Sequence, residues 1–373
     1  MENVDYLIIG GGISGTSAAE TIRQEDQNSK IVILEDEKYP LYSRVQIPYY
    51  LRNVKTREQI FLRDFESYKT KNIEYLTQKF VVSLNLSESI VKTSDGESYN
   101  FKKLLLTTGG SPKKLNKYPN EHSMQTIEDA DRIYEDIKKA KKGIIIGSGF
   151  IALEFLETFL YHKLDTSLCV NKDGFWANFL SKEVSNCILS VISKRGVKVY
   201  YGDVPEIPDS PDVIVGTGIG IDVSRDFIKS SGLKFDMGIV ADSKLKTSAD
   251  NVYAAGDVVK FFSTKLDRYV KYGNWTNAAI SGKYAGFNLL GKDLAYDNLS
   301  AYSIKPEGLS IVFLGFAGTD ENTVTKTKVY SETECAQFFI RNGKLDGCIL
   351  INKSIERSTY QRIIESREDF KVD

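Results

Sequence analysis

Residues 4–36 read VDYLIIGGGISGTSAAETIRQEDQNSKIVILED, and the rest of the chain can be placed from this stretch. Residues 4–9 are apolar and rich in β-branched side chains, which predicts a buried parallel strand. The turn that follows carries Gly10, Gly12 and Gly15 in the spacing G-x-G-x-x-G. In such a turn the first glycine permits the tight bend, the second lets the backbone approach a pyrophosphate, and the third allows close packing of helix and strand.

The residues after the turn complete the pattern of a dinucleotide-binding fold. Residues 14–23 continue as a predicted helix, whose N-terminal N–H groups and positive dipole end would face the phosphates. A second apolar strand, residues 31–34, ends at Glu35, where a carboxylate can accept both hydroxyls of an adenosine ribose. The glycines alone are weak evidence, whereas strand, glycines, helix, strand and acid in this order are strong evidence.

Length and composition restrict the class of protein. The chain has 373 residues, which predicts two or three domains. Its 49 basic and 50 acidic residues nearly balance, so there is no electrostatic footprint for nucleic acid or an anionic membrane. No apolar run is long enough to cross a bilayer, and the N-terminal run lacks the basic flank of a secretory signal. Four cysteines without C-x-x-C spacing and two histidines argue against a metal site and favour a reducing, cytoplasmic location.

The segment 35–51, EDEKYPLYSRVQIPYYL, is a predicted loop dense in aromatic residues. Its aromatic side chains could cap the sheet, but Arg44, beside a phosphate-binding turn, is also a natural partner for a diphosphate. Residues 80–106 then alternate as short antiparallel strands, with Asp95-Gly96 as a hairpin turn. The excursion returns to a parallel strand that ends at Thr107, Thr108 and Gly109.

The glycine motif recurs at 141–159, KKGIIIGSGFIALEFLETF. A strand at 143–146 precedes Gly147-x-Gly149-x-x-Ala152 and an apolar helix, so two bound dinucleotides are the economical interpretation. The second unit continues with a predicted strand at 166–170, a helix near 182–195, and strands at 197–201 and 212–218.

Beyond residue 248 the chain returns to the first fold. In SADNVYAAGDVVKF, residues 248–261, a strand presents Gly256 and Asp257 at its end. Asp257 is either a helix cap or a ligand for a bound hydroxyl. The predicted fold class is α/β: two Rossmann-like dinucleotide-binding domains (1–114 with 244–298, and 115–243) plus a small C-terminal α+β domain, 299–373, without a visible catalytic constellation.

With these motifs placed, the chain resembles the FAD/NAD(P)H flavoprotein reductases with two dinucleotide folds, the pyridine nucleotide-disulfide oxidoreductase superfamily. It is most similar to rubredoxin and ferredoxin reductases, the FAD subunit of nitrite reductase and apoptosis-inducing-factor-like proteins. The resemblance implies that FAD is held by Gly10, Gly11, Gly12, Ile13, Ser14, Gly15, Glu35, Asp36, Arg44, Val82, Thr108, Gly109, Gly256 and Asp257, with Asn274 and Trp275 beside the isoalloxazine. It places NADH or NADPH at Gly147, Gly149, Phe150, Ile151 and Gly218. For Trp275, plain core packing is an equally good interpretation.

The sequence also departs from this family. Val45 stands where the thiol and coenzyme A disulfide reductases carry their redox cysteine. Tyr49 stands where ferredoxin-reductase relatives have a lysine that pairs with a helix glutamate, while the glutamate, Glu154, remains. We therefore expect Glu154 and Tyr49 to act near the flavin, with Glu154 paired to Arg44 or Tyr49. Only GDVPEIPDSP separates residues 201 and 212, so the second fold is trimmed.

These patterns predict an FAD-dependent NAD(P)H oxidoreductase. Without a redox cysteine, electrons must leave the flavin directly for a rubredoxin, a ferredoxin, a partner subunit or oxygen. Two alternatives stay open. One is an FAD-bearing interaction protein with weak turnover. The other is a thiol or coenzyme A disulfide reductase, which Val45 at the redox-cysteine position argues against. The second fold has Asn171 at the strand end that normally selects the nucleotide, which leaves NADH and NADPH both acceptable. The oligomeric state is left open, with a homodimer as one option.

Overall fold

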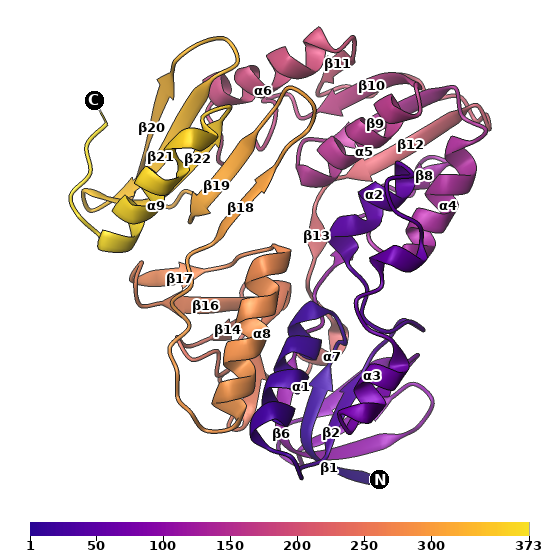
Figure 1. Cartoon of the computed structure of the whole chain (residues 1–373), viewed down its shortest axis with the longest axis vertical. Coiled ribbons are helices and arrows are strands. Elements are labelled where there is room, and N and C mark those ends of the chain that lie inside the picture. Colours follow the sequence, from indigo (N-terminus) through magenta and orange to yellow (C-terminus); the bar gives the residue numbers. More distant parts are fainter. Residues whose placement is uncertain (373) are drawn as a thin grey trace. The chain divides into compact units, whose positions relative to one another are not determined.

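The computed structural model describes residues 1–372 and divides into two compact units, each assembled from separate stretches of the chain (Figure 1). The first unit comprises Met1–Val45, Arg57–Ser111 and Asp222–Asn298. The second comprises Gln46–Thr56, Pro112–Ile221 and the chain from Leu299 onward. At two points the chain passes from one unit to the other within a short strand, β7 (Ser111–Pro112) and β13 (Ile221–Asp222). These two strands pair with each other.

The first unit is built on a sheet in the order β3-β2-β1-β6-β5-β4, with β15 also paired to β6. β1 is parallel to both β2 and β6, as the apolar runs predict, because strands buried on both faces need no polar alternation. The hairpin of β5 and β6 turns at Asp95-Gly96, also as predicted. The strands are β1 (Glu2–Ile9), β2 (Ile31–Leu34), β3 (Ile73–Leu76), β4 (Val81–Asn85), β5 (Ile90–Thr93), β6 (Ser98–Leu106) and β15 (Val252–Ala254).

Two helices of this unit, α1 (Ile13–Glu25) and α8 (Trp275–Leu289), pack closely against each other. A side chain at Gly282 would collide with the backbone of Ser14, and one at Gly286 would lie 2.9 Å from the carbonyl oxygen of Ala18. The two glycines therefore allow α8 to approach α1. The unit also holds α3 (Phe65–Thr70), α7 (Asp226–Lys229), the 3-10 helices Glu58–Ile60 and Gly256–Val258, and a small sheet of β14 (Ile239–Ala241), β16 (Val259–Ser263) and β17 (Arg268–Val270).

The second unit contains a sheet in the order β11-β10-β9-β12-β8, in which all pairings are parallel. The predicted second dinucleotide fold is therefore present. Helix α4 begins with a capping box, in which Thr126 accepts from the backbone of Asp129 and Asp129 accepts from that of Thr126. The elements are α2 (Ile47–Leu51), β8 (Glu121–His122), α4 (Ile127–Ile137), β9 (Lys142–Gly147), α5 (Phe150–Tyr161), β10 (Asp165–Val170), α6 (Lys182–Lys194), β11 (Lys198–Tyr201) and β12 (Val213–Gly218). The 3-10 helix Arg44–Gln46 lies where the chain passes from the first unit into the second.

The C-terminal part of this unit is an antiparallel sheet in the order β18-β19-β22-β21-β20, covered by α9 (Arg357–Ser366). Strands β19, β21 and β22 are mostly apolar, as expected for the sheet of the predicted C-terminal α+β domain, whereas the edge strands β18 and β20 carry no clear apolar signal. The polar edge strand β20 carries Lys326 and Lys328, charges of the kind that discourage further strand pairing. The strands are β18 (Ala301–Ile304), β19 (Ile311–Gly315), β20 (Thr323–Val329), β21 (Cys335–Arg341) and β22 (Lys344–Ile351), followed by the 3-10 helix Ser354–Glu356.

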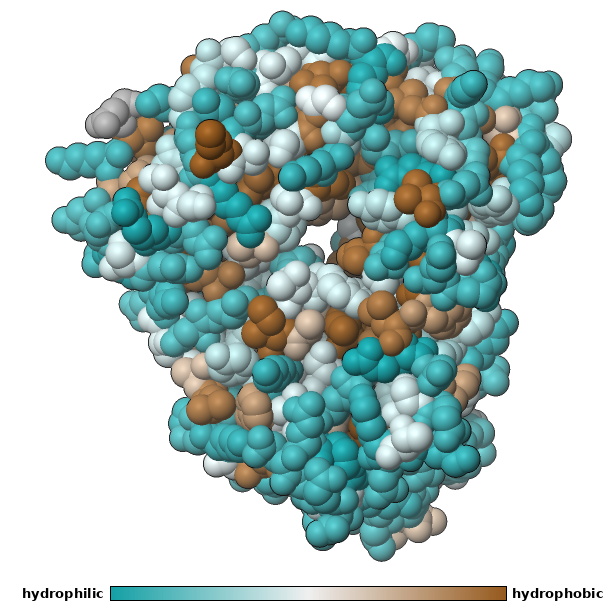
Figure 2. All heavy atoms as spheres, viewed as in Figure 1, coloured by the Kyte–Doolittle hydropathy of each residue, from teal (hydrophilic) through white to brown (hydrophobic). Residues whose placement is uncertain are grey.

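The surface in Figure 2 is mostly hydrophilic, with apolar residues scattered over it. Across residues 1–372, no helix combines the length and the apolar character needed to cross a membrane.

Candidate functional site

The first glycine turn leaves an open space over Gly12. Gly10 has φ +103°, and a side chain there would collide with the carbonyl of Thr107 at the end of β6. Gly12 is the N-cap of α1 and makes no side-chain cap hydrogen bond. An ideal Cβ built on Gly12 meets no atom within 4 Å. Backbone N–H groups at the start of α1 therefore border unfilled space, which suits an anionic group.

Glu35 lies directly beside this turn, at the end of β2. Its carboxylate accepts a hydrogen bond from the backbone N–H of Gly11 and another, at 3.1 Å, from that of Glu37. Burial, together with the neighbouring Asp36, raises the pKa of Glu35 to about 8. A buried carboxyl in this position is suited to pair with ligand hydroxyls rather than with solvent.

Three buried side-chain oxygens around the turn have no hydrogen-bond partner within residues 1–372: Ser14 Oγ, Thr108 Oγ1 and Asp257 Oδ1. A Cβ on Gly256 would lie 3.1 Å from Ser14 Cβ, and a Cβ on Gly10 would lie 3.2 Å from the backbone nitrogen of Thr108, so these residues border the same turn. Unpaired buried oxygens are costly and therefore uncommon in a finished site. A ligand with several hydroxyl and phosphate oxygens fits both these atoms and the space over Gly12.

Two cations of the same unit act electrostatically on Asp257. Burial raises the pKa of Asp257, and the charges of Lys271 and Arg44 oppose that rise. Burial lowers the pKa of Lys271, and Asp257 in turn opposes this. Lys271 lies in the loop before α8, just ahead of Asn274, which caps that helix by accepting from the backbone of Asn277 at 2.9 Å. Trp275 is the first residue of α8 and is partly exposed.

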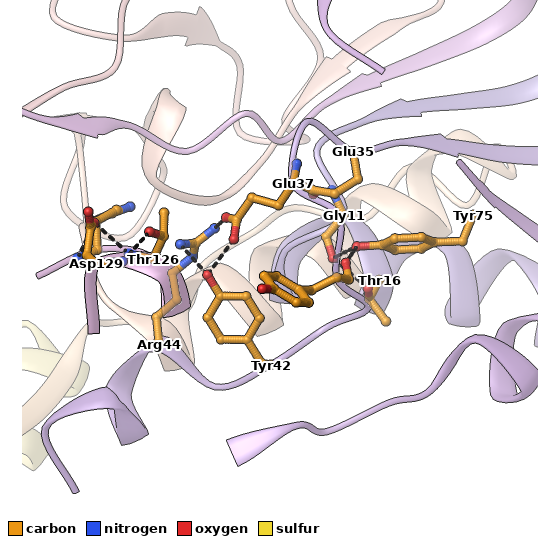
Figure 3. A network of polar contacts seen from close by, with 11 residues as sticks. Gly11, Thr16, Glu35, Glu37, Tyr42, Arg44, Tyr75, Thr126 and Asp129 are labelled. Atoms are coloured by element: carbon orange, nitrogen blue, oxygen red, sulfur yellow. Dashed lines mark hydrogen bonds and ion pairs between the residues drawn. The ribbon is translucent and has the colours of Figure 1, made fainter. Parts of the chain in front are cut away.

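Arg44 is engaged by protein groups. Figure 3 shows its guanidinium directed at Glu37 and Tyr42, with which it forms an ion pair and a hydrogen bond of 3.0 Å. Glu35, Asp36 and Glu37 can bring three carboxylate oxygens within 4.8 Å of one another, and Arg44 supplies positive charge to this group. Contact with a diphosphate would require Arg44 to share its donors or change partners.

Two further predicted residues lie at the margins of this region. Gly109 has φ +57° and borders open space just after β6. Val82 lies at an irregularity of β4, and 56% of its surface is exposed. Tyr75, which the sequence did not single out, lies closer to the turn: its hydroxyl donates to the carbonyl of Gly11 at 3.3 Å.

The second glycine turn has the same backbone plan. A side chain at Gly147 (φ +143°) would collide with the carbonyl of Gly218, so β9 and β12 end side by side. Gly149 is the N-cap of α5 and makes no side-chain cap hydrogen bond, and Phe150 and Ile151 begin the helix. At Gly149, unlike Gly12, a Cβ meets one atom within 4 Å, Nε1 of Trp176 at 3.4 Å.

Glu154, one turn into α5, pairs with Arg52, so the expected partners Arg44 and Tyr49 are wrong. Arg52 Nη2 lies 3.8 Å from Glu154 Oε2, and the Arg52 guanidinium sits 5.1 Å from the ring centre of Tyr49. Burial raises the pKa of Glu154 to about 7, although Arg52 opposes the shift. The reason is local: helix α2 carries Arg52 at its C-terminal end, toward α5.

The strand end of β10 and the cysteines also bear on the chemistry. Asn171 is exposed, and its side chain accepts from the backbone of Asp173 at 3.4 Å, so Asp173 belongs to the turn toward Gly174. The side chain of Val45, at the expected cysteine position, is 51% exposed. All four cysteines are free and buried: Cys169, Cys187, Cys335 and Cys348.

Comparison with known proteins confirms the predicted superfamily. Residues 4–282 match the family model described as pyridine nucleotide-disulphide oxidoreductase. NADH-rubredoxin oxidoreductase of Clostridium acetobutylicum is 25% identical over 381 residues, which covers 99% of this chain and 97% of that protein. Apoptosis-inducing factor 3 of Homo sapiens is 26% identical over 338 residues, covering 84% of this chain and 55% of that protein.

Solved structures share the fold along the entire chain. The crystal structure of the covalent putidaredoxin reductase–putidaredoxin complex matches with a TM-score of 0.87 at 21% identity, covering 100% of this chain and 95% of the matched one. The predicted fold class, with two dinucleotide-binding folds, is confirmed by this likeness.

Proposed function

The chain belongs to the pyridine nucleotide-disulphide oxidoreductase family, and from this premise we propose that it is an FAD-dependent NAD(P)H oxidoreductase. When bound, FAD supplies the centre that accepts hydride from a nicotinamide nucleotide and passes electrons to an acceptor. The contribution of the protein is to bind both nucleotides, orient them and adjust the charge around them.

The observation that carries the proposal is the trio of unpaired oxygens, Ser14 Oγ, Thr108 Oγ1 and Asp257 Oδ1, beside the open space at Gly12. We assign this space to FAD, with Glu35 accepting ribose hydroxyls and the start of α1 facing the diphosphate. The FAD domain would comprise 1–114 and 244–298. Its other proposed contacts are Gly10, Gly11, Ile13, Gly15, Asp36, Arg44, Val82, Gly109, Gly256, Asn274 and Trp275.

We assign NADH or NADPH to the second glycine turn, in a domain comprising 115–243, with Gly147, Gly149, Phe150, Ile151 and Gly218 as contacts. Glu154 and Tyr49 are the proposed catalytic residues, and Arg52 joins them through its contacts with both. Because the pKa of Glu154 is raised to about 7, its carboxyl can take up or release a proton at neutral pH.

The acceptor is proposed to be a small redox protein of the rubredoxin or ferredoxin type, or a partner subunit. Two relatives support this, since their names describe electron transfer to rubredoxin and a complex with putidaredoxin. The buried cysteines and Val45 argue against a thiol or coenzyme A disulfide as acceptor. Residues 299–373 would form the interface domain, and we propose a cytoplasmic protein with a homodimer as one option.

The test is to purify the full chain, measure FAD per chain, and follow NADH and NADPH oxidation with an artificial dye as acceptor. We expect a yellow protein with one noncovalent FAD and turnover with at least one nucleotide. A protein without flavin would refute the proposal. Flavin without turnover would favour the interaction-protein alternative, which the short connection between β11 and β12, Gly202 to Asp212, also supports.

A further inference from the structure

Trp176 is held firmly beside the second glycine turn, in the segment between β10 and α6. Its backbone N–H donates to the carbonyl of Ser148 at 3.0 Å. Its ring packs against Phe150, with ring centres 4.8 Å apart, and against Phe313 of β19 at 5.4 Å. Trp176 has φ +43°, in the left-handed region that a bulky residue rarely adopts. Surrounding structure therefore fixes a conformation that is unfavourable by itself.

The indole presents its nitrogen edge to Gly149. Apart from Gly149, its chain neighbours and its own helix, Nε1 of Trp176 is the one atom of residues 1–372 within 4 Å of an ideal Cβ on Gly149, at 3.4 Å, so the other ring atoms lie farther away. At the matching glycine of the first turn, Gly12, nothing lies within that distance. In such a motif the second glycine lets the protein backbone approach the pyrophosphate. At Gly149 this approach is bordered by one polar group, the indole N–H of Trp176.

That group is a donor without an acceptor. An indole N–H can only donate a hydrogen bond, and Trp176 is partly exposed, so its N–H is open to a ligand. No group within residues 1–372 accepts a hydrogen bond from Nε1 of Trp176, and only the backbone of this residue is hydrogen-bonded. The first N–H groups of α5 lie at the same turn and receive no side-chain cap, because the N-cap residue is Gly149. Several donors that converge in this way favour an anion with several acceptor oxygens.

We propose that Trp176 binds the diphosphate of the nicotinamide nucleotide, with its indole N–H donating to a phosphate oxygen seated over Gly149. This inference rests on the proposed function of the second fold and adds a binding residue from outside the glycine motif. It also gives a reason why the strained backbone at Trp176 is kept: the strain aims the nitrogen edge of the ring.

The test uses the flavin-loaded full chain and ADP-ribose, which carries the diphosphate but cannot transfer hydride. Its Kd is measured by calorimetry for wild type, Trp176→Phe and Trp176→Ala. Trp176→Phe keeps an aromatic ring and removes only the N–H, so it should weaken binding roughly tenfold, as loss of a hydrogen bond to a charged group does. Phe179→Leu is the matched control, because Phe179 packs on the same ring (centres 6.3 Å apart) but offers no donor. It should leave the Kd unchanged.

The outcomes separate this inference from the function on which it rests. If wild type binds ADP-ribose and Trp176→Phe binds it equally well, the inference is wrong and the function stands. Tighter binding by either Trp176 variant would also overturn it, since the indole would then be an obstacle. If wild type neither binds ADP-ribose nor oxidises NADH or NADPH, the function and the inference fall together. Should Trp176→Ala lose flavin or unfold, Trp176→Phe still decides.

Discussion

Gly12 and Gly149 hold the same position in two copies of one motif, and their surroundings differ by a single side chain. Gly12 borders empty space and has an ordinary extended backbone, φ −62° and ψ −173°, so another residue can replace it without strain. Any effect of such a replacement must then arise from what enters that space. This makes Gly12 a clean position at which to test the flavin site.

We predict that Gly12→Val abolishes FAD binding while the fold persists. The valine side chain would occupy the space assigned to the pyrophosphate, yet it meets no protein atom within 4 Å of its Cβ. Flavin content after purification is measured by absorbance, with the thermal midpoint of flavin-free wild type as control. A variant that retained full flavin would show that the phosphates lie elsewhere.

Glu154 gives a prediction about pH. Its pKa in the folded chain, about 7, lies above the ordinary value of 4.5, so folding favours the protonated carboxyl. The cost of ionisation is absent below the ordinary pKa and grows as pH rises through the folded pKa. Because a quarter of the side chain is exposed (24%), we expect wild type to lose about 1–2 kcal/mol of unfolding free energy relative to Glu154→Gln between about pH 5 and pH 8.

Denaturant titrations of both proteins at the two pH values measure this difference. The same variant should remove a step near neutral pH from the profile of hydride transfer, measured under single turnover. If the stability difference between wild type and Glu154→Gln is the same at both pH values, and their pH profiles coincide, Glu154 is a solvated helix carboxylate with no part in the chemistry.

The sequence predicted the site residues that belong to a recognisable motif. It missed the residues that reach the site only through tertiary packing. Glu35 and Asp257 follow apolar strands directly, so a strand end predicts where they lie. Arg52 and Trp176 have no such signal, since each reaches its neighbour through a short helix or a connecting segment. Their contacts depend on how α2 and the segment before α6 pack, which no spacing in the sequence expresses.

Among the elements, strand β10 bears on the choice of nicotinamide nucleotide. It ends at Val170, followed by Asn171, an exposed residue that can donate to or accept from a hydroxyl and does not repel a phosphate. Asp173 lies within the turn that follows, where its backbone N–H donates to the side chain of Asn171. The carboxylate that selects NADH in such folds is therefore missing from its usual place at this strand end.

We predict weak discrimination between NADH and NADPH. The measurement is the ratio of kcat/KM for the two nucleotides with a dye as acceptor. A preference for NADH above about a thousandfold, roughly 4 kcal/mol of differential transition-state binding, would contradict this prediction. It would require a carboxylate from another element to reach the ribose.

Buried apolar runs give the clearest prediction of strands. Strands β1, β2, β9 and β12 each contain an apolar, buried run, and the helices that follow the glycine turns have fixed starting points. Strands β18 and β20 lie at the edges of the C-terminal sheet, where one side of the backbone is unpaired and polar residues are tolerated. Their sequences, AYSI and TVTKTKV, therefore lack the apolar signal on which a prediction rests.

At the scale of the whole molecule, the burial of the cysteines bears on whether electrons from the flavin can pass through a thiol. Burial raises the pKa of each thiol, to about 11 for Cys169, so little thiolate forms near neutral pH. We predict that a variant with all four cysteines replaced by alanine keeps its NAD(P)H-to-dye activity within about twofold per bound flavin. Flavin content serves as the control for folding. A large loss of turnover in a fully flavinated variant would indicate thiol chemistry.

The discontinuous first unit has a consequence for biosynthesis. Its sheet is extended by β15, which pairs with β6, yet β6 ends at Leu106 and β15 begins at Val252. At about 5–20 residues per second, a ribosome needs roughly seven to thirty seconds to make the stretch between them. The parallel sheet of the second unit is complete by Gly218, before β15 and α8 emerge. The strands that are made first, and the apolar side of α1, thus stay uncovered while the sheet of the second unit is completed. A ribosome-associated chaperone would be expected to bind the nascent chain during this interval.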